Sequence, residues 1–139
     1  WAEAHTLAGL SIIAELVGAM STLLDLTVDY VKQRHQFGKP IASFQVVQHR
    51  CARMYTWLEQ SRSLLLKAAM VGEKERTRAV TTARAYIGDT ALKLAEEAVQ
   101  LHGGMGVTNE LAVGRGLRRV LLLSRLHGGG IAARSALAA

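Results

Sequence analysis

Apolar residues recur at three- and four-residue steps along the first quarter of the chain. They are Leu10, Ile13, Leu16, Val17, Met20, Leu24 and Val28. This spacing places them on one side of a helix and predicts a helix over residues 6–33. Glu15, Asp25 and Asp29 fall largely off the apolar stripe, which gives the helix a polar side as well.

A loop and a second helix are expected next. Gly38 permits unusual backbone angles and Pro40 disfavours helix at the residue before it, so residues 35–42 are predicted to form a loop. Ser43 is a plausible N-cap for a helix that reaches about Val71. The apolar side of this helix comprises Phe44, Val47, Cys51, Met54, Trp57 or Leu58, Ser61 and Leu65.

A third apolar stripe predicts a helix over residues 77–101. Gly72 is a C-cap candidate for the preceding helix, and residues 73–76 are expected to form a short charged connection. The stripe comprises Val80, Ala83, Ile87, Ala91, Leu94 and Val99 or Ala98. Its period is again that of a helix with one buried side.

Glycines separate the remaining elements. The cluster over residues 103–106 ends the third helix. A fourth helix is expected from about Asn109 or Val113 to Leu126, and the glycines at 128–130 stop it. The Ala-rich tail that follows is expected to be either helical or frayed.

Four helices joined by short connections predict an all-α fold, an antiparallel four-helix bundle. The 139 residues fit one domain, residues 1–139. Breaks in the helical pattern are expected near residues 35–42, 72–76 and 102–109, where Gly or Pro interrupts the stripes.

Composition suggests association with another subunit. Half of the residues are hydrophobic, so apolar surface beyond one small bundle is expected to pair between subunits. The longest apolar run, Leu10–Leu24, is interrupted by Glu15, and no membrane span is predicted. Cys51, the single cysteine, is expected to be a small buried apolar residue rather than a nucleophile. With no internal disulfide and no secretory signal at Trp1, the sequence predicts a cytoplasmic location.

The net charge of +6 implies anionic partners. Phosphorylated ligands and nucleic acid both fit this charge. The basic residues are scattered along helices without aromatic interleaving, so the isoelectric point alone favours a nucleic-acid module and no nucleic-acid partner is predicted. His5, His35, His49 and His102 show no metal-ligand spacing, so no metal site is predicted.

The cluster Gly103, Gly104 and Gly106 has two interpretations. Glycines let a planar or phosphorylated ligand touch the backbone, and a following helix capped by Thr108 or Asn109 adds favourable potential for anions. Alternatively, the cluster is a helix C-cap and turn that needs positive φ. It is not a dinucleotide fingerprint, because no strand precedes it.

Two segments together resemble the C-terminal helical domain of the FAD-dependent acyl-CoA dehydrogenases. They are Arg34-His-Gln-Phe-Gly-Lys-Pro and Gln100-Leu-His-Gly-Gly-Met-Gly-Val-Thr. In that family a Gln-x-x-Gly-Gly-x-Gly stretch lies against the flavin of a neighbouring subunit. The resemblance, which runs from about Leu7 to about Gly128, therefore implies cofactor contacts for Gln100, Gly103 and Gly104.

The first segment resembles the family's Arg-x-x-Phe-Gly arrangement with a glutamine in the next helix. The resemblance implies that Arg34 lies on the pyrophosphate or adenine side of FAD, with Phe37 beside the cofactor. Gln36 and Gln45 join this set of cofactor-binding candidates. A guanidinium fork binds phosphate bidentately, which suits Arg34. His102, inside the second segment, either contacts the ligand or fills space.

The resemblance also implies one catalytic candidate. The family's reaction removes a proton from the substrate Cα while a hydride passes to the flavin, and many members use a glutamate in a Glu-Gly-Thr segment as the base. Counting without gaps from Gly103-Gly104 puts His127 at that glutamate. Imidazole can act as a base near neutral pH, although a helix C-terminus favours its protonated form. The alternative is a helix-end residue without catalytic function.

Arg118-Arg119 is similar to an Arg-Asp pair of the family. We expect Arg118 to make a structural ion pair and Arg119 to lie on a solvated basic face. Some members carry their glutamate on the first helix, but Glu15, the early acidic candidate, lies about two turns too far along.

The resemblance implies a C-terminal domain of an acyl-CoA dehydrogenase that takes FAD and an acyl-CoA substrate. It further implies a homo-oligomer, or a hetero-oligomer with acyl-CoA dehydrogenase-like subunits. The family's N-terminal helical and β-domains are not in these 139 residues, so the chain alone is expected to be inactive. A second hypothesis is a non-catalytic oligomerisation subunit or remnant that contributes to a partner's flavin site. The third is the basic nucleic-acid-binding module.

Overall fold

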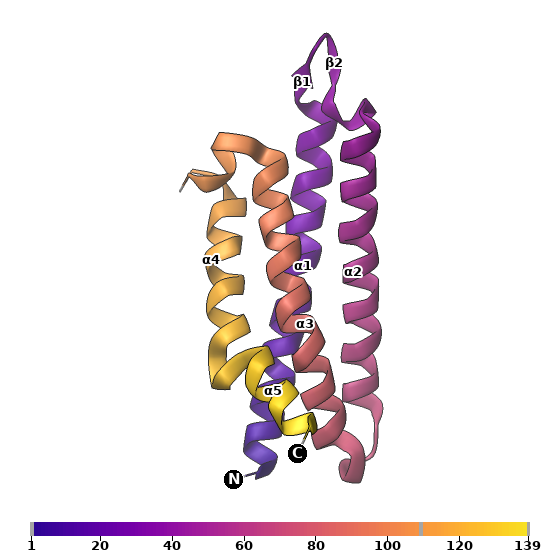
Figure 1. Ribbon diagram of the computed structural model, residues 1–139, viewed down its shortest axis with the longest axis vertical. Helices are drawn as coiled ribbons and strands as arrows, with labels where there is room; N and C mark the ends of the chain where they lie inside the picture. Colours follow the sequence, from indigo (N-terminus) through magenta and orange to yellow (C-terminus); the bar gives the residue numbers. More distant parts are fainter. Residues whose placement is uncertain (1, 109, 139) are drawn as a thin grey trace.

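The chain folds as a bundle of antiparallel helices in a computed structural model that describes residues 2–108 and 110–138 (Figure 1). The long helices are α1 (Ala2–Gln33), α2 (Gln45–Met70), α3 (Glu73–His102) and α4 (Ala112–Arg125), followed by α5 (Gly129–Ala138). The short elements are β1 (His35–Gln36), β2 (Lys39–Pro40), and the 3-10 turns η1 (Ile41–Ser43), η2 (Gly103–Val107) and η3 (Leu126–Gly128). The predicted four-helix bundle is confirmed, and the tail forms a fifth helix.

Helix α3 is the centre of the bundle, because it contacts α1, α2, α4 and α5. Its predicted stripe is buried from Val80 to Ala98. Across from it, Ile13, Leu16 and Met20 of α1 are fully buried in the same core. The apolar periodicity in the sequence therefore identified the contact faces of the two helices that make most of the core.

Helix α1 is, among the described helices, the one long and apolar enough to cross a membrane by length and composition. Its buried residues recur from Thr6 to Val31 and face α2, α3 and α4. The core helix of a bundle passes the same test, and packing within the fold buries 39% of the most apolar window of α1.

Ser43 does not cap α2, contrary to the prediction. The helix begins at Gln45, and Phe44 in an extended conformation is its N-cap without a side-chain hydrogen bond. The Ser43 hydroxyl instead donates to the Pro40 carbonyl at 2.7 Å. The serine therefore closes the η1 turn that precedes the helix.

The connection between α2 and α3 is shorter than predicted. Gly72 is the N-cap of α3, with φ −62° and ψ 162°, and Val71 is the C-cap of α2. The backbone amides of Glu75 and Arg76 both donate to the Gly72 carbonyl at 3.1 Å. The predicted connection at 73–76 is thus helical, and its acidic residues suit the positive end of the helix dipole.

The start of α4 also differs from the prediction. Thr108 does not cap it, because the helix begins at Ala112 with Leu111 as N-cap. The Thr108 hydroxyl donates to the Met105 carbonyl at 2.9 Å and so belongs to the η2 turn. The alternative cap, Asn109, lies outside the described residues.

Both motif segments lie at the same end of the bundle (Figure 1). The β1–β2 hairpin follows α1 there, and η2 follows α3. The two chain ends, η3 and α5 lie toward the opposite end. The fold therefore separates the hairpin end, which carries the predicted cofactor residues, from the end that carries His127.

Candidate functional site

An open groove of about 440 Å³ joins the two motif segments at the hairpin end. Five of the predicted cofactor residues line it: Arg34, Gln36, Gln100, Gly103 and Gly104. Arg34 and Gln36 come from the junction of α1 with the hairpin, Gln100 from the last turn of α3, and the two glycines from η2. Helices α1 and α3 run in the same direction, so both end at this side of the bundle, and the chain breaks at both helix ends to form the groove (Figure 1).

A two-residue turn builds the hairpin beside Arg34. Phe37 and Gly38 have φ of 55° and 77°, the positive values that a type I′ hairpin turn requires. Pairing of His35 with Pro40 closes the two short strands. The backbone amide of Ile41 then donates to the Arg34 carbonyl at 2.8 Å, which fixes the arginine backbone at the base of the hairpin.

Phe37 and Gln45 are not among the residues that line the groove. Phe37 lies at the hairpin tip with 89% of its surface exposed, and its ring meets Phe44 edge-on at 6.0 Å. The Lys39 ammonium lies 4.5 Å from the centre of the Phe44 ring on the same hairpin. Gln45 is exposed at the start of α2. A contact from either residue would require a ligand or partner that extends past the groove.

The fold requires glycine at two of the three clustered positions, and for different reasons. Gly106 is needed for packing, because a Cβ there would lie 2.6 Å from the Val99 carbonyl oxygen. Gly103 is needed for its backbone, because φ is 62°. Gly104 needs neither: its φ is not positive and a Cβ would meet nothing within 4 Å. The absence of a side chain at Gly104 therefore leaves backbone open toward the groove, as close approach of a ligand requires.

His102 forms part of the groove floor. It is 6% exposed and stacks on Tyr30, with ring centres 4.2 Å apart and planes at 24°. Its Nδ1 donates to the Ala98 carbonyl at 2.8 Å, since a carbonyl oxygen can only accept. The Tyr30 hydroxyl in turn donates to the His102 carbonyl at 3.4 Å. The sequence left its role open, and the structure gives this side chain a fixed orientation.

His127 lies far from the groove. Helix α1 spans 32 residues, about 48 Å at the helical rise, with His5 near its start and Arg34 just after its end. The His127 ring meets the His5 ring edge-on, with centres 5.1 Å apart. His127 itself has φ 51° and ψ 38°, a left-handed conformation uncommon outside glycine.

Arg84 holds the backbone around His127. Its Nη2 donates to the Leu126 carbonyl at 2.9 Å and to the His127 carbonyl at 3.2 Å. Partial burial lowers the pKa of the Arg84 guanidinium, which remains cationic at neutral pH. A positive charge therefore occupies the carbonyl end of the chain where α4 stops.

Of the two neighbouring arginines on α4, Arg119 rather than Arg118 forms an ion pair. Arg119, predicted to be solvated, donates from Nε to Glu15 Oε1 at 2.6 Å and links α4 to α1. The pairing with Glu15 raises the pKa of Arg119. Arg118 is exposed and has no ion pair among the described residues, so its predicted structural pairing is wrong. The α4 register turns position 119, rather than 118, toward α1.

The surroundings of Cys51 disfavour a nucleophilic role. The thiol is half-buried. Its burial, and to a smaller extent the charge of Glu97, raise its pKa, which disfavours the nucleophilic thiolate.

Within residues 2–108 and 110–138, no group of three His, Cys, Asp or Glu side chains could hold a metal ion.

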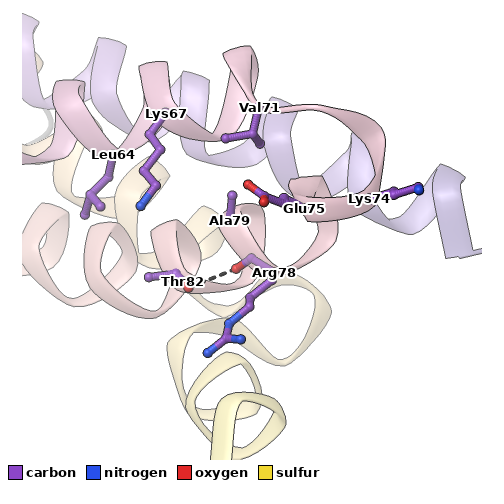
Figure 2. A pocket seen from close by; sticks show the side chains of 8 residues that line it. All are labelled: Leu64, Lys67, Val71, Lys74, Glu75, Arg78, Ala79 and Thr82. Atoms are coloured by element: carbon purple, nitrogen blue, oxygen red, sulfur yellow. Dashed lines mark hydrogen bonds between the residues drawn. The ribbon is translucent and has the colours of Figure 1, made fainter.

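A second cavity of about 430 Å³ lies at the turn between α2 and α3. Figure 2 shows Lys67 and Glu75 pointing into the space between the helices, whereas the Lys74 ammonium and the Arg78 guanidinium point away from it. Leu64 and other apolar side chains complete the wall. The charges that point inward are of opposite sign, and no predicted site residue lines this cavity.

Comparison with known proteins identifies the fold family. The family model for the C-terminal domain of acyl-CoA dehydrogenases matches residues 6–138. The Bacillus subtilis protein YngJ, described as a probable acyl-CoA dehydrogenase, is 37% identical over 123 residues, which cover 86% of this chain and 32% of YngJ.

Two solved structures show the same fold. An acyl-CoA dehydrogenase from Geobacillus kaustophilus matches with a TM-score of 0.87 and 29% identity over 96% of this chain and 36% of its own. PigA, solved with FAD and proline, matches with a TM-score of 0.88 and 28% identity over 96% of this chain and 35% of its own. The chain thus spans about a third of the length of these relatives. It belongs to the acyl-CoA dehydrogenase family of flavoproteins and corresponds to the C-terminal domain.

Proposed function

We propose that this chain supplies part of the FAD site of an acyl-CoA dehydrogenase-like flavoprotein, which carries out α,β-dehydrogenation of acyl-CoA thioesters. The observation that carries the proposal is the single groove formed by Arg34, Gln36, Gln100, Gly103 and Gly104. Helix α2 and most of α3 separate the two segments in sequence. In the groove, the first segment offers an arginine that can bind phosphate, and the second offers open glycine backbone that a ligand can approach closely.

Bound FAD would supply the hydride acceptor, and the residues of this chain would bind and orient it. Arg34 would hold a phosphate with its guanidinium fork. The amides of Gln36 and Gln100 offer both donors and acceptors to ribose or phosphate groups. The open backbone at Gly104 would lie against the cofactor. Phe37 and Gln45 would contact it only where it leaves the groove.

We infer that the groove and His127 serve different flavins. They lie toward opposite ends of α1, which is about 48 Å long at the helical rise. In an oligomer, the groove of one copy would complete a site to which another copy contributes its His127 end. Exposed apolar residues on α2, namely Val46, Tyr55, Leu66 and Met70, provide surface for such association.

Self-association is therefore expected of the 139-residue chain in solution. Light scattering at tens of micromolar protein, a concentration chosen to favour association, should give a mass of a dimer or larger. A monomer at that concentration would contradict the shared-site arrangement.

We further propose a cytoplasmic location, where the reducing environment would keep Cys51 as a thiol.

A non-catalytic subunit is the second candidate. It is favoured by His127, which occupies the predicted position of a glutamate. The ring that His127 contacts, His5, and the Arg84 side chain that binds its carbonyl are both basic. Such a subunit would bind FAD in its groove but would lend it to a competent partner. Activity with acyl-CoA and an artificial electron acceptor, measured after the family's other domains are supplied, separates the two candidates.

FAD binding to the chain tests the proposal directly. Quenching of FAD fluorescence on titration with the 139-residue chain should saturate, and Arg34→Met should weaken the affinity about tenfold or more, as loss of a charged hydrogen bond predicts. Arg53→Met is the matched control, since Arg53 is an exposed arginine of α2 that does not line the groove. Equal losses in both variants would indicate only a general effect of charge and would contradict the proposal.

A further inference from the structure

The chain between α4 and α5 turns through consecutive residues with positive φ. His127, Gly128 and Gly129 have φ of 51°, 81° and 59°. Glycine adopts such angles readily, whereas histidine does so rarely. A residue other than glycine keeps this backbone only where its surroundings impose it, and such residues are concentrated at functional sites. The interactions that hold His127 in this conformation therefore bear on its function.

Arg84 of α3 binds both peptide groups that flank the Cα of His127. Its Nη2 donates to the Leu126 carbonyl, in the peptide group before His127, and to the His127 carbonyl, in the peptide group after it. An extended residue would turn these two carbonyls to opposite sides, where one nitrogen could not bind both. The two hydrogen bonds therefore constrain φ and ψ of residue 127, and with them the direction of its Cα–Cβ bond.

Helix α3 holds the chain on both sides of this turn. Arg84 is half-buried, and a Cβ at Gly9 of α1 would lie 3.1 Å from Arg84 Cδ, so glycine at that position leaves room for the arginine stem. One helical turn further along α3, Asp89 forms an ion pair with Arg134 of α5. The Arg84 hydrogen bonds are charge-assisted and meet the carbonyl end of α4, where a cation is favoured.

The orientation of residue 127 matters for the proposed chemistry. With its backbone in this conformation, the His127 ring meets the His5 ring near the start of α1, with centres 5.1 Å apart. A general base must lie within hydrogen-bond reach of the proton that it removes, and a displacement of about 1 Å can cost two orders of magnitude in rate. A residue that fixes the backbone at this position would therefore affect the rate of proton removal.

We propose that Arg84 is a positioning residue, which orients the side chain at position 127 by binding the peptide groups on both sides of it. This inference rests on the proposed function, because position 127 is the candidate base of the proposed reaction. In this role Arg84 acts through residue 127 rather than on the substrate. The role does not depend on the side chain at position 127, since Arg84 binds backbone carbonyls there.

NMR of the 139-residue chain can report the backbone conformation of residue 127. The intraresidue nuclear Overhauser effect between Hα and the amide proton is strong at positive φ, where these protons lie closest. Phe37, with φ of 55° at the hairpin tip, is an internal reference toward the opposite end of the bundle. In Arg84→Met the effect at residue 127 should weaken about threefold, because a left-handed backbone without support is disfavoured. The effect at Phe37 should not change.

Further variants separate the hydrogen bonds from the loss of charge. Arg78→Met removes an exposed arginine from the same helix and should leave the effect at residue 127 unchanged. Arg84→Lys keeps a cation with N–H donors and should weaken the effect less than Arg84→Met. If Arg84→Met does not fold, Arg84→Gln, which is too short to reach the carbonyls, serves the same comparison. An unchanged effect at residue 127 in a folded variant without these hydrogen bonds would overturn the inference.

The catalytic consequence is measured on the protein assembled with FAD and the domains that supply the rest of the family's site. In the His127→Glu background, Arg84→Met should slow single-turnover flavin bleaching by an acyl-CoA thioester about tenfold or more, at unchanged FAD affinity. In the His127→Ala background the same substitution should leave the rate unchanged, since no side chain remains to be oriented. Equal slowing in both backgrounds would indicate a general structural effect and would overturn the inference.

Failure of this inference and failure of the proposed function give different results. Absence of FAD binding, or of bleaching by the His127→Glu protein, would contradict the proposed function whatever the NMR comparison shows. Bleaching by the His127→Glu protein that is insensitive to Arg84→Met would remove the positioning role and leave the proposed function intact.

Discussion

Two glycine-rich segments of similar composition lie toward opposite ends of this bundle, and they differ in what the glycines do. In the segment at 128–130, each glycine is tied to the fold. A Cβ at Gly129 would lie 2.3 Å from the Ser124 carbonyl oxygen, and φ there is 59°. In the segment at 103–106, Gly104 has open space where a Cβ would be.

The difference teaches how a cofactor loop can be told from a structural turn. A glycine that the fold requires is explained by a clash or by positive φ. Gly106, Gly128 and Gly129 have such explanations, and a Cβ at Gly130 would lie 3.0 Å from Asp89 Oδ1. Gly104 has neither, a property that it shares with Gly18 and Gly72, and it differs from both in lining the groove between the two motif segments.

The strongest test of the structural segment is Gly129→Ala. We expect a loss of about 3 kcal/mol in the free energy of unfolding, from left-handed strain together with overlap of Cβ with the Ser124 carbonyl. Gly18→Ala on the exposed side of α1 is the control, where a Cβ meets nothing within 4 Å and helix propensity should improve. Urea unfolding followed by circular dichroism gives both values. A change below 1 kcal/mol for Gly129→Ala would contradict the assignment.

Gly106→Ala should show that one glycine of the first segment is structural too. Its Cβ would lie 2.6 Å from the Val99 carbonyl oxygen, which is backbone and cannot rotate away. The expected loss is about 2 kcal/mol, with φ unstrained. The same unfolding measurement checks it, and an unchanged midpoint would remove the distinction between Gly106 and Gly104.

His127→Glu tests the chemistry at the other end. Assembled with FAD and the domains that supply the rest of the family's site, the Glu variant is expected to dehydrogenate acyl-CoA about tenfold faster, because a positioned general base contributes at least this much. The Arg84 cation near the backbone of this position would accommodate a carboxylate. The measurement is the single-turnover rate of flavin bleaching by a panel of acyl-CoA thioesters. Fast bleaching by the parent but not by the variant would mean that His127 or another group is the base.

Gly103→Ala should have a smaller effect on stability than the first two substitutions. Its φ of 62° with ψ of −146° is a backbone conformation nearly restricted to glycine and costs an alanine about 1 kcal/mol or slightly more, but its Cβ would meet nothing within 4 Å. Thermal unfolding should therefore show a modest drop that lies between Gly106→Ala and no change. A loss as large as that of Gly129→Ala would show that the first segment is as tightly built as the second.

The helical periodicity of apolar residues in the sequence predicted most of the fold. The stripes through Ile13 and Ile87 identified the faces that α1 and α3 bury, because a helix with one apolar side must bury it. The hairpin was missed, because its strands are two residues long and Phe37 adopts positive φ without a glycine. The fifth helix was left open, since an Ala-rich tail is helical only when it packs, as it does here on α3.

The candidate site was predictable in its residues and less so in its geometry. The motifs identified Arg34 and Gly104 as candidate cofactor residues, and both line the groove. The different reasons for Gly104 and Gly106 depend on the distance to Val99, a contact that no spacing encodes. Likewise, the partner of Glu15 depended on the exact turn of α4, which placed Arg119 rather than its neighbour toward α1.

The most direct test of the account is FAD binding by Gly104→Leu. Because a Cβ at this position meets nothing within 4 Å, the account predicts a free energy of unfolding unchanged within about 0.5 kcal/mol, and an FAD affinity at least tenfold weaker. Gly18→Leu, an equally open position on α1, is the matched control and should leave both quantities unchanged. Undiminished FAD affinity in folded Gly104→Leu would contradict the assignment of this groove to the cofactor.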